Sequence, residues 1–174
     1  MNNLIKESVS EEYDAATYYR QANTMLINTG FDAICLKGEC PPLKPWNANE
    51  FPELANWLDN NNQILNLIKI GSEQKHYLRF IEEYEESWSL PTENFPDALY
   101  KYLLCHLGFT LSNDPGSSKI PEELAISLNL LNQLKSSMTL IRGIMAIAFE
   151  RDLHLLLQSD LLEQTSTIDI YSTI

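Results

Sequence analysis

Histidine and cysteine are the residues of this chain whose side chains could hold a metal or act as a nucleophile, and there are three of each. His76, His106 and His154 fall in three separate segments that we expect to be helical. Glu150 and His154 lie one helical turn apart, so they would share a helix face. A di-metal carboxylate bundle requires Glu-x-x-His on two helices and two further glutamates, and that set is missing. The spacing therefore favours a surface hydrogen bond between Glu150 and His154, and no metal or cofactor is predicted.

The cysteines do not form a recognisable reactive site either. Cys105 and His106 are adjacent, but neighbours on a helix do not face each other, so a nucleophile–base pair is not expected. A core thiol and a core histidine with satisfied hydrogen bonds are expected instead. Cys35 and Cys40 form a C-x4-C pair without a second pair, which is a poor zinc site. An odd number of cysteines fits free thiols in a reducing compartment.

Motifs of the common catalytic folds are missing from the sequence. It contains no G-x-G-x-x-G, P-loop, G-x-S-x-G or H-E-x-x-H pattern. We therefore predict that the chain is not an enzyme.

Four aromatic residues and one amide are the candidate binding residues. Tyr18, Tyr19, Trp46 and Trp57 flank a proline-rich segment, and an aromatic-lined groove beside a rigid loop is a common way to hold a peptide. The alternative is that these large side chains fill the core, where they bury the most area. Asn61 stands where a helix stripe requires an apolar residue, so it either caps a neighbouring loop or faces a polar pocket. The capping role is favoured, because buried amides bind backbone more often than ligand.

Composition points to one helical domain with an acidic surface. A chain of 174 residues is long enough for one domain, and six glycines are few for an all-β fold. The formal charge of −12 would repel a nucleic-acid backbone, so nucleic-acid binding is not expected. A solvated surface explains this charge best. The alternative is a basic partner for the acidic run at 82–86.

Apolar spacing predicts six helices, at 10–27, 49–70, 72–89, 94–111, 120–136 and 138–159. Gly71 is expected to end the second, and the apolar fourth is expected to be central. The last two nearly abut, which predicts an antiparallel hairpin. The fold class is therefore all-α, over a single domain 1–174: an irregular helical bundle or a TPR-like α-hairpin array of five to six helices. The tail 160–174 is expected to be irregular or docked.

Core-facing stripes can be assigned to the last two helices. Leucines line the first of them, and mixed aliphatic residues line the second: Leu124, Leu128, Leu131 and Leu134, then Ile141, Ile144, Met145, Ala148 and Leu153.

Three similar openings, "FPEL", "FPDAL" and "IPEEL", begin at Phe51, Phe95 and Ile120. Their unequal spacing excludes a solenoid of fixed period. Proline and acids are favoured in the first turn of a helix, so the openings mark helix starts.

No segment predicts export or membrane insertion. The sequence opens without a signal-peptide pattern, and the most apolar stretch, 138–149, is too short to span a bilayer and contains Arg142. A soluble, cytoplasmic chain is expected, or an exported or membrane-anchored one if an N-terminal segment was trimmed.

Residues 13–68 resemble the amino-terminal part of a group of uncharacterised helical proteins of planctomycete-type bacteria. The resemblance rests on a Tyr-Tyr-x-x-Ala helix, a Pro-x-x-Pro-Trp loop and a following helix, with the matching residues Tyr18, Tyr19, Ala22, Pro42, Pro45, Trp46, Pro52, Glu53, Ala55, Trp57, Leu58 and Asn61. Members usually run longer and often carry an amino-terminal membrane segment, which is not seen in this sequence. The resemblance implies a helical-repeat-like architecture and a scaffold role, and it transfers no catalytic residue.

Three functions follow as hypotheses. The first is a non-enzymatic helical interaction or scaffold module that binds a protein or peptide partner. The second is a small-ligand-binding protein or enzyme with a site near Asn61, His76 or His106. The third is an acidic effector or mimic that binds a basic partner.

Overall fold

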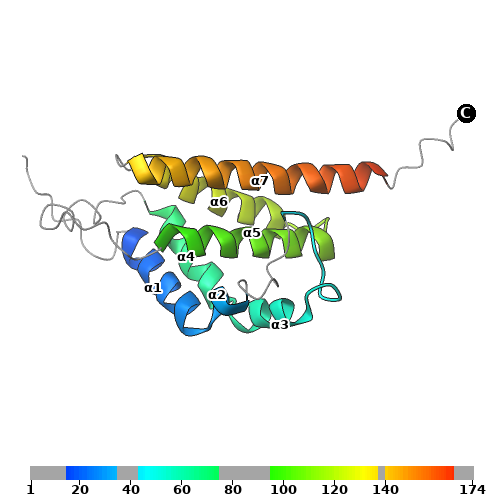
Figure 1. The fold of residues 1–174 in the computed structure, drawn as a ribbon, viewed down its shortest axis with the longest axis horizontal. Helices are drawn as coiled ribbons and strands as arrows, with labels where there is room; N and C mark the ends of the chain where they lie inside the picture. The colour runs from blue at the N-terminus through cyan, green and yellow to red at the C-terminus, as the bar shows by residue number, and fades with distance from the viewer. Residues whose placement is uncertain (1–14, 35–42, 75–94, 137–139, 167–174) are drawn as a thin grey trace, which may run out of the picture.

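The computed structural model of the chain describes residues 15–34, 43–74, 95–136 and 140–166. These residues form helices and no strand, with the bounds α1 Ala15–Asn28, α2 Phe31–Ile34, α3 Pro52–Asn60, α4 Gln63–Glu73, α5 Phe95–Asn113, α6 Lys119–Ser136 and α7 Leu140–Ser166. α2 is a single turn, and the six longer helices form an irregular bundle (Figure 1). The prediction of an all-α bundle is confirmed.

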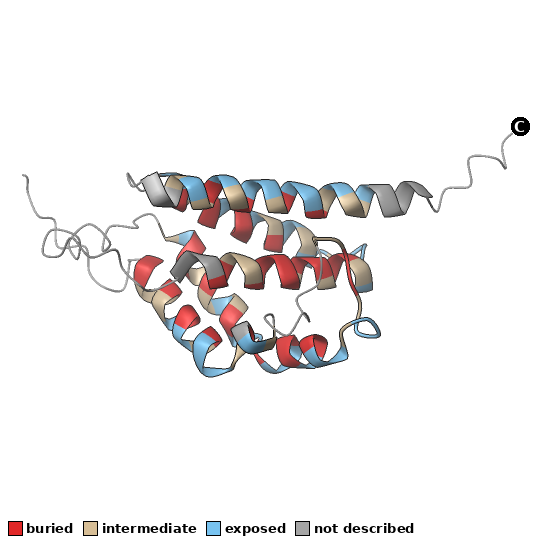
Figure 2. Ribbon diagram, in the orientation of Figure 1, coloured by how far each residue is buried: buried red, intermediate tan, exposed pale blue. Residues whose placement is uncertain are grey.

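α5 lies at the centre of this bundle. It packs against α1, α6 and α7, while α4 packs against α1 and α6. Its residues Leu99, Tyr102 and Leu107 are almost completely buried, and Figure 2 shows buried positions along much of its length. α6 and α7 run antiparallel as neighbours, and α7 forms the outermost layer on its side (Figure 1). The central place of the 94–111 helix and the pairing of the last two helices agree with the sequence pattern.

The predicted helix 49–70 is wrong in one respect, because it is two helices. α3 ends at Asn60 and α4 begins at Gln63. Asn61 leaves the helical conformation with φ −122° and ψ 23°, and its Nδ2 donates to the Trp57 carbonyl at 2.8 Å. Asn62 makes a similar bond, to the Asp59 carbonyl at 3.0 Å. Asparagine side chains compete in this way with the helical backbone bonds, which explains the break.

The prediction that Gly71 ends a helix is wrong. Gly71 lies inside α4, which continues to Glu73. A Cβ atom built on Gly71 would lie 2.7 Å from Cε1 of the Tyr19 ring. The glycine therefore allows α1 and α4 to pack closely.

The predicted stripes of α6 and α7 are partly wrong. Leu131, Leu134 and Leu153 are buried as expected, but Leu128 is 43% exposed and Ile144 is 59% exposed. The buried face of α7 consists of Ala146, Phe149, Leu153 and Leu156. Both helices carry aliphatic residues on more than one face, so spacing alone could not select the face that packs.

Helix starts are closer to the prediction. α3 begins at Pro52, α5 at Phe95 and α6 at Lys119, next to the three similar openings. α7 continues to Ser166, beyond the predicted end at 159. The predicted helix 72–89 and its acidic run lie outside the described residues, except for the end of α4, as do Cys35, Cys40 and His76.

Among the described residues, no helix combines the length and the apolar composition that crossing a bilayer requires.

Candidate functional site

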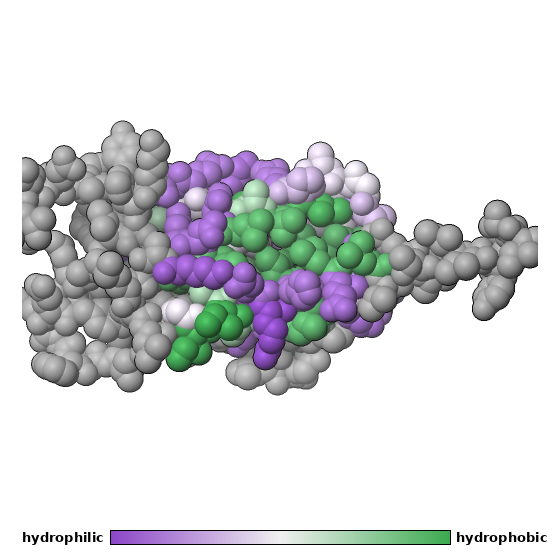
Figure 3. Space-filling view, turned by 90° about the horizontal axis from the view of Figure 1, so that it is seen from above, coloured by the Kyte–Doolittle hydropathy of each residue, from purple (hydrophilic) through white to green (hydrophobic). Residues whose placement is uncertain are grey.

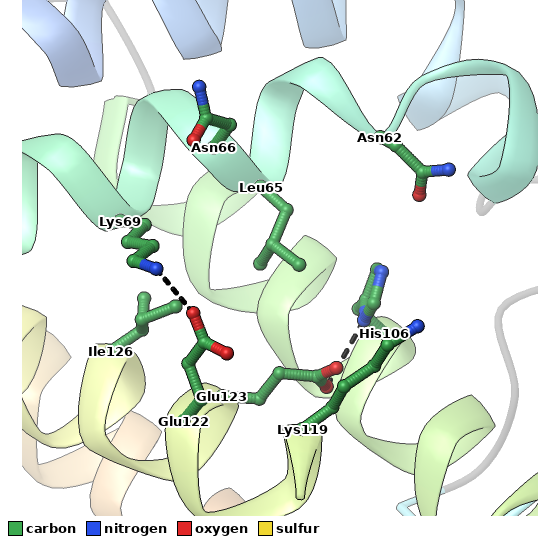
Figure 4. Close-up of a pocket in the computed structure, with 9 residues that line it drawn as sticks. All are labelled: Asn62, Leu65, Asn66, Lys69, His106, Lys119, Glu122, Glu123 and Ile126. Carbon is green, nitrogen blue, oxygen red and sulfur yellow. Dashed lines mark hydrogen bonds and ion pairs between the residues drawn. The ribbon is translucent and has the colours of Figure 1, made fainter.

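A pocket of about 310 Å³ opens between α4, α5 and α6, a volume at the low end of small-molecule sites. α4 and the residue before it contribute Asn62, Leu65, Asn66 and Lys69; α5 contributes His106; α6 contributes Lys119, Glu122, Glu123 and Ile126 (Figure 4). The lining is mixed, with two aliphatic side chains among amides and charged groups.

His106 and Glu123 form a buried pair at the wall of this pocket. His106 Nδ1 lies 3.1 Å from Glu123 Oε2, and the two side chains are 13% and 5% exposed. The other carboxylate oxygen, Oε1, accepts a hydrogen bond from Thr110 Oγ1 at 2.9 Å. A buried carboxylate requires such partners, because losing hydration without replacement costs several kcal/mol. Glu123 is therefore held in place from α5 by a ring and a hydroxyl.

The second ring nitrogen of His106, Nε2, points away from Glu123. Figure 4 shows the ring between Glu123 and Asn62, with this nitrogen on the Asn62 side. Because Nδ1 is occupied by the carboxylate, Nε2 is the ring nitrogen that a bound molecule would meet. The buried acid thus fixes the direction in which the imidazole is presented.

The two lysines of the pocket differ in their partners. Lys69 Nζ forms an ion pair with Glu122, whose carboxylate raises the pKa of the lysine through a hydrogen bond and charge attraction. Lys119 has no carboxylate within ion-pair distance among the described residues. It is also the first residue of α6, where the helix dipole is positive. Lys119 is thus the positive charge that remains to be matched.

A smaller pocket of about 180 Å³ adjoins the first, and it shares Asn62, His106 and Lys119. It extends along the end of α5 to Asn113 and to the turn at Ser117. His106 and Lys119 therefore face one depression with two lobes, which we call the His106 pocket.

The predicted binding residues lie elsewhere. Tyr19 and Trp46 are fully buried, Trp57 and Asn61 are each 8% exposed, and Tyr18 is partly exposed. The polar atoms of the buried aromatics reach neighbouring helices. Tyr19 Oη donates to Gln133 Oε1 at 2.6 Å, and Trp46 Nε1 donates to the Cys105 carbonyl at 2.9 Å.

The structure brings only some of these five residues together. Asn61 donates its side-chain hydrogen bond to the Trp57 carbonyl, so its partner is backbone, as the sequence favoured, but on its own helix rather than on a neighbouring loop. Trp57 Nε1 in turn donates to the Thr29 carbonyl at 3.0 Å. The aromatics thus join helices and loops in the core, and their role in partner binding stays a prediction.

Two other titratable residues singled out from the sequence, Cys105 and Glu150, do not line the His106 pocket. Burial raises the pKa of the Cys105 thiol from 9.0 to about 12, in keeping with the predicted core thiol. Glu150 is paired with Lys135 Nζ at 2.7 Å, across the α6–α7 contact. Within the described ranges, no three His, Cys, Asp or Glu side chains converge as metal ligands.

Of the His106 pocket, the sequence predicted His106 as a site residue of the second hypothesis but missed Glu123, Lys119 and Asn62. One signal was present. Glu123 precedes Ser127, Leu130 and Leu134 at helical spacing, and all of these are buried. An acid on a core-facing stripe requires a partner, and His106 also stood on such a stripe.

Comparison of the chain with protein-family models, curated proteins and solved structures finds no match.

Proposed function

We propose that the protein binds a small anionic molecule, one that carries a carboxylate or phosphate group, in the His106 pocket. The observation that supports this most directly is the buried Glu123–His106 pair, which presents an imidazole nitrogen to a pocket that also contains the unmatched Lys119. This is a binding function, so the prediction of a non-enzymatic protein is part of the proposal.

Charge accounts for the choice of an anion. The two acids of the larger lobe already have partners, since Glu122 pairs with Lys69 and Glu123 contacts His106 and Thr110, whereas Asp59 and Asp114 line only the smaller lobe. The positive charge of Lys119 and the positive end of α6 act on whatever enters. Lysine is a common ligand for phosphate and carboxylate groups.

The apolar side chains of the pocket indicate the chemistry of the uncharged part of the ligand. Leu65 and Ile126 line the pocket opposite one another on α4 and α6 (Figure 4). They favour a short carbon skeleton beside the anionic group, and the volume of about 310 Å³ limits it to a small metabolite.

Isothermal titration calorimetry with inorganic phosphate and with succinate tests the proposal. Wild-type protein is expected to bind at least one of these probes. Lys119→Ala removes the charged donor, and the loss of a charged hydrogen bond of about 1.5–3 kcal/mol weakens binding at least about tenfold.

Lys135→Ala is the matched control, because Lys135 lies on the same helix and does not line the pocket. Its affinity is expected to equal that of wild type. Absence of binding by wild type, or equal losses in both variants, would reject the pocket as an anion site.

A second candidate function, protein interaction, is favoured by a different observation. Four large aliphatic residues of α7 are exposed, namely Ile144, Ile147, Leu155 and Leu161, by 59%, 66%, 42% and 62%. Figure 3 views the molecule from the side of α7 and shows hydrophobic residues gathered along the middle of that face. Exposed apolar groups gathered on one surface are typical of contact sites. If the protein binds a partner protein, the exposed aliphatic residues of α7 are therefore better candidates for the contact than the buried aromatic residues.

A further inference from the structure

We propose that anion binding in the His106 pocket is coupled to the uptake of one proton by His106, because buried Glu123 holds the first proton of the ring on Nδ1. This inference rests on the proposed function, since it specifies the protonation state in which the pocket accepts an anion. It makes the pocket a pH-dependent site whose affinity for anions rises as the pH falls through neutrality.

The contact between His106 and Glu123 decides which ring nitrogen carries the proton. Nδ1 lies 3.1 Å from Glu123 Oε2, and the side chain of Glu123 is only 5% exposed. A neutral imidazole has one N–H group and one nitrogen with a lone pair. A lone pair on Nδ1 would face a carboxylate oxygen that little water screens, so repulsion places the single proton on Nδ1.

The neutral ring therefore turns a lone pair towards the pocket. Nε2 lies on the Asn62 side of the ring, away from Glu123 (Figure 4). With the proton on Nδ1, Nε2 is an acceptor only, and it repels a phosphate or carboxylate oxygen. A second proton gives the imidazolium ion, which carries an N–H group at both nitrogens and lies between two negative groups, the ligand and Glu123. The anion and this proton are thus expected to bind together.

Histidine is the residue type around the pocket that ordinarily changes its charge near neutral pH. The other ionisable side chains that line the two lobes come from α3, α4, α6 and the turn after α5, and they are Asp59, Asp114, Glu122, Glu123, Lys69 and Lys119. Burial raises the pKa of Tyr102, whose ring centroid lies 5.9 Å from that of His106. Carboxylates ordinarily titrate at about pH 4 and lysines at about pH 10. A change in anion affinity between pH 7 and pH 9 therefore reports on His106.

Isothermal titration calorimetry with succinate and with sulfate at pH 7, 8 and 9 tests the coupling. Both probes keep two negative charges over this range, whereas inorganic phosphate would change its own charge. Because each bound anion brings one proton where the unliganded ring is neutral, wild-type affinity is expected to fall at least about tenfold from pH 7 to pH 9. Titrations in two buffers of different ionisation enthalpy count the protons, and an uptake approaching one proton per bound anion is expected at pH 8.

Glu123→Gln tests the role of the carboxylate. The amide oxygen can keep the bond to Thr110, which places the amide nitrogen where Oε2 faces His106 Nδ1. The amide can then donate to Nδ1, so the neutral ring carries its proton on Nε2 and binding no longer requires a second proton. The affinity of this variant is expected to change by less than about threefold from pH 7 to pH 9.

His154→Gln is the matched control, because His154 is an exposed histidine on α7 that does not line the pocket. It is expected to retain the pH dependence and the proton uptake of wild type. Circular dichroism of each variant verifies that the helices are retained.

The anion site and its proton coupling fail in different ways. A wild type that binds neither probe at pH 7 rejects the anion site and the coupling with it. A wild type that binds equally at all three pH values, without proton uptake, overturns the coupling and leaves the anion site standing. A Glu123→Gln protein whose affinity falls as steeply as that of wild type overturns the role of Glu123.

Discussion

A single buried carboxylate organises the His106 pocket at the residue scale. Glu123 is 95% buried at its side chain, and its oxygens face His106 Nδ1 and Thr110 Oγ1. His106 Nδ1 and Glu123 Oε2 make an ion-pair contact at 3.1 Å that lacks hydrogen-bond geometry, and neither atom has a hydrogen-bond partner among the described residues. The residue that shapes the pocket is thus one that a ligand hardly touches.

Thr110→Val tests this arrangement through stability. The change removes the hydroxyl that donates to Glu123 and leaves a buried carboxylate oxygen without that partner. We expect the free energy of unfolding to fall by about 1–3 kcal/mol, measured by urea denaturation.

Thr24→Val is the control for this loss. Thr110 Oγ1 also lies 3.2 Å from the carbonyl four residues before it, and Thr24 makes the same kind of bond on α1, where it is exposed. Its change is expected to stay within about 0.5 kcal/mol. Equal effects of the two substitutions would show that the Thr110–Glu123 bond does not stabilise the fold.

The raised pKa of Cys105 predicts a loss of stability in alkaline solution. Burial raises this pKa from 9.0 to about 12, so the folded protein keeps the thiol neutral. Above pH 9 the unfolded chain releases this proton more easily than the folded chain does, and stability falls as the pH rises towards 12. Burial of Tyr102 raises the pKa of its phenol too, which adds to the loss.

Urea denaturation of wild type and of Cys105→Ala at pH 8, 9 and 10 measures the thiol contribution. The variant lacks the thiol, so its stability should fall less steeply above pH 9. Parallel decreases in the two proteins would contradict the assignment.

At the scale of helices, the sequence predicted which segments are helical better than it predicted where each helix ends and which of its faces is buried. The openings at Phe51 and Ile120 marked helix starts correctly, because proline and acids suit the first turn of any helix, and Phe95 is the first described residue of α5. The break at Asn61 was missed, because its stripe looked continuous while the side chain bonded the Trp57 carbonyl. The faces of α6 and α7 could not be chosen from spacing, since neighbouring helices decide which of several aliphatic faces is buried.

Gly71 and Gly143 provide a matched test of helix packing. A methyl group at Gly71 would meet the Tyr19 ring at 2.7 Å, whereas one at Gly143 meets nothing within 4 Å. Gly71→Ala is expected to destabilise the protein by about 1–3 kcal/mol through this overlap. Gly143→Ala is expected to stabilise α7 by about 0.5–1 kcal/mol, because alanine favours helices.

Thermal or urea unfolding of the two glycine variants measures the change in stability relative to wild type. Opposite signs support the close approach of α1 and α4 at Gly71. A Gly71→Ala protein as stable as wild type would contradict it.

At the scale of the whole molecule, the candidate site could be predicted only in part. Its side chains come from three stretches that are far apart in sequence, 62–69, 106 and 119–126, and only the packing of α4, α5 and α6 joins them. Large aromatics such as Trp46 looked like binding residues, but the area they bury placed them in the core. His106 was named in the second hypothesis, although its apolar stripe favoured a core histidine.

The proposed anion site is tested most directly by long-range ¹H–¹⁵N spectra of the histidine side chains during separate titrations with inorganic phosphate and with succinate. We predict that the Nε2 signal of His106 shifts and saturates with at least one of the two probes, and that exposed His154 on α7 does not respond in this way. Lys119→Ala is expected to move the His106 response to a ligand concentration at least about tenfold higher. A His106 signal that stays unchanged in both titrations, or that follows His154 throughout them, would contradict the proposed function.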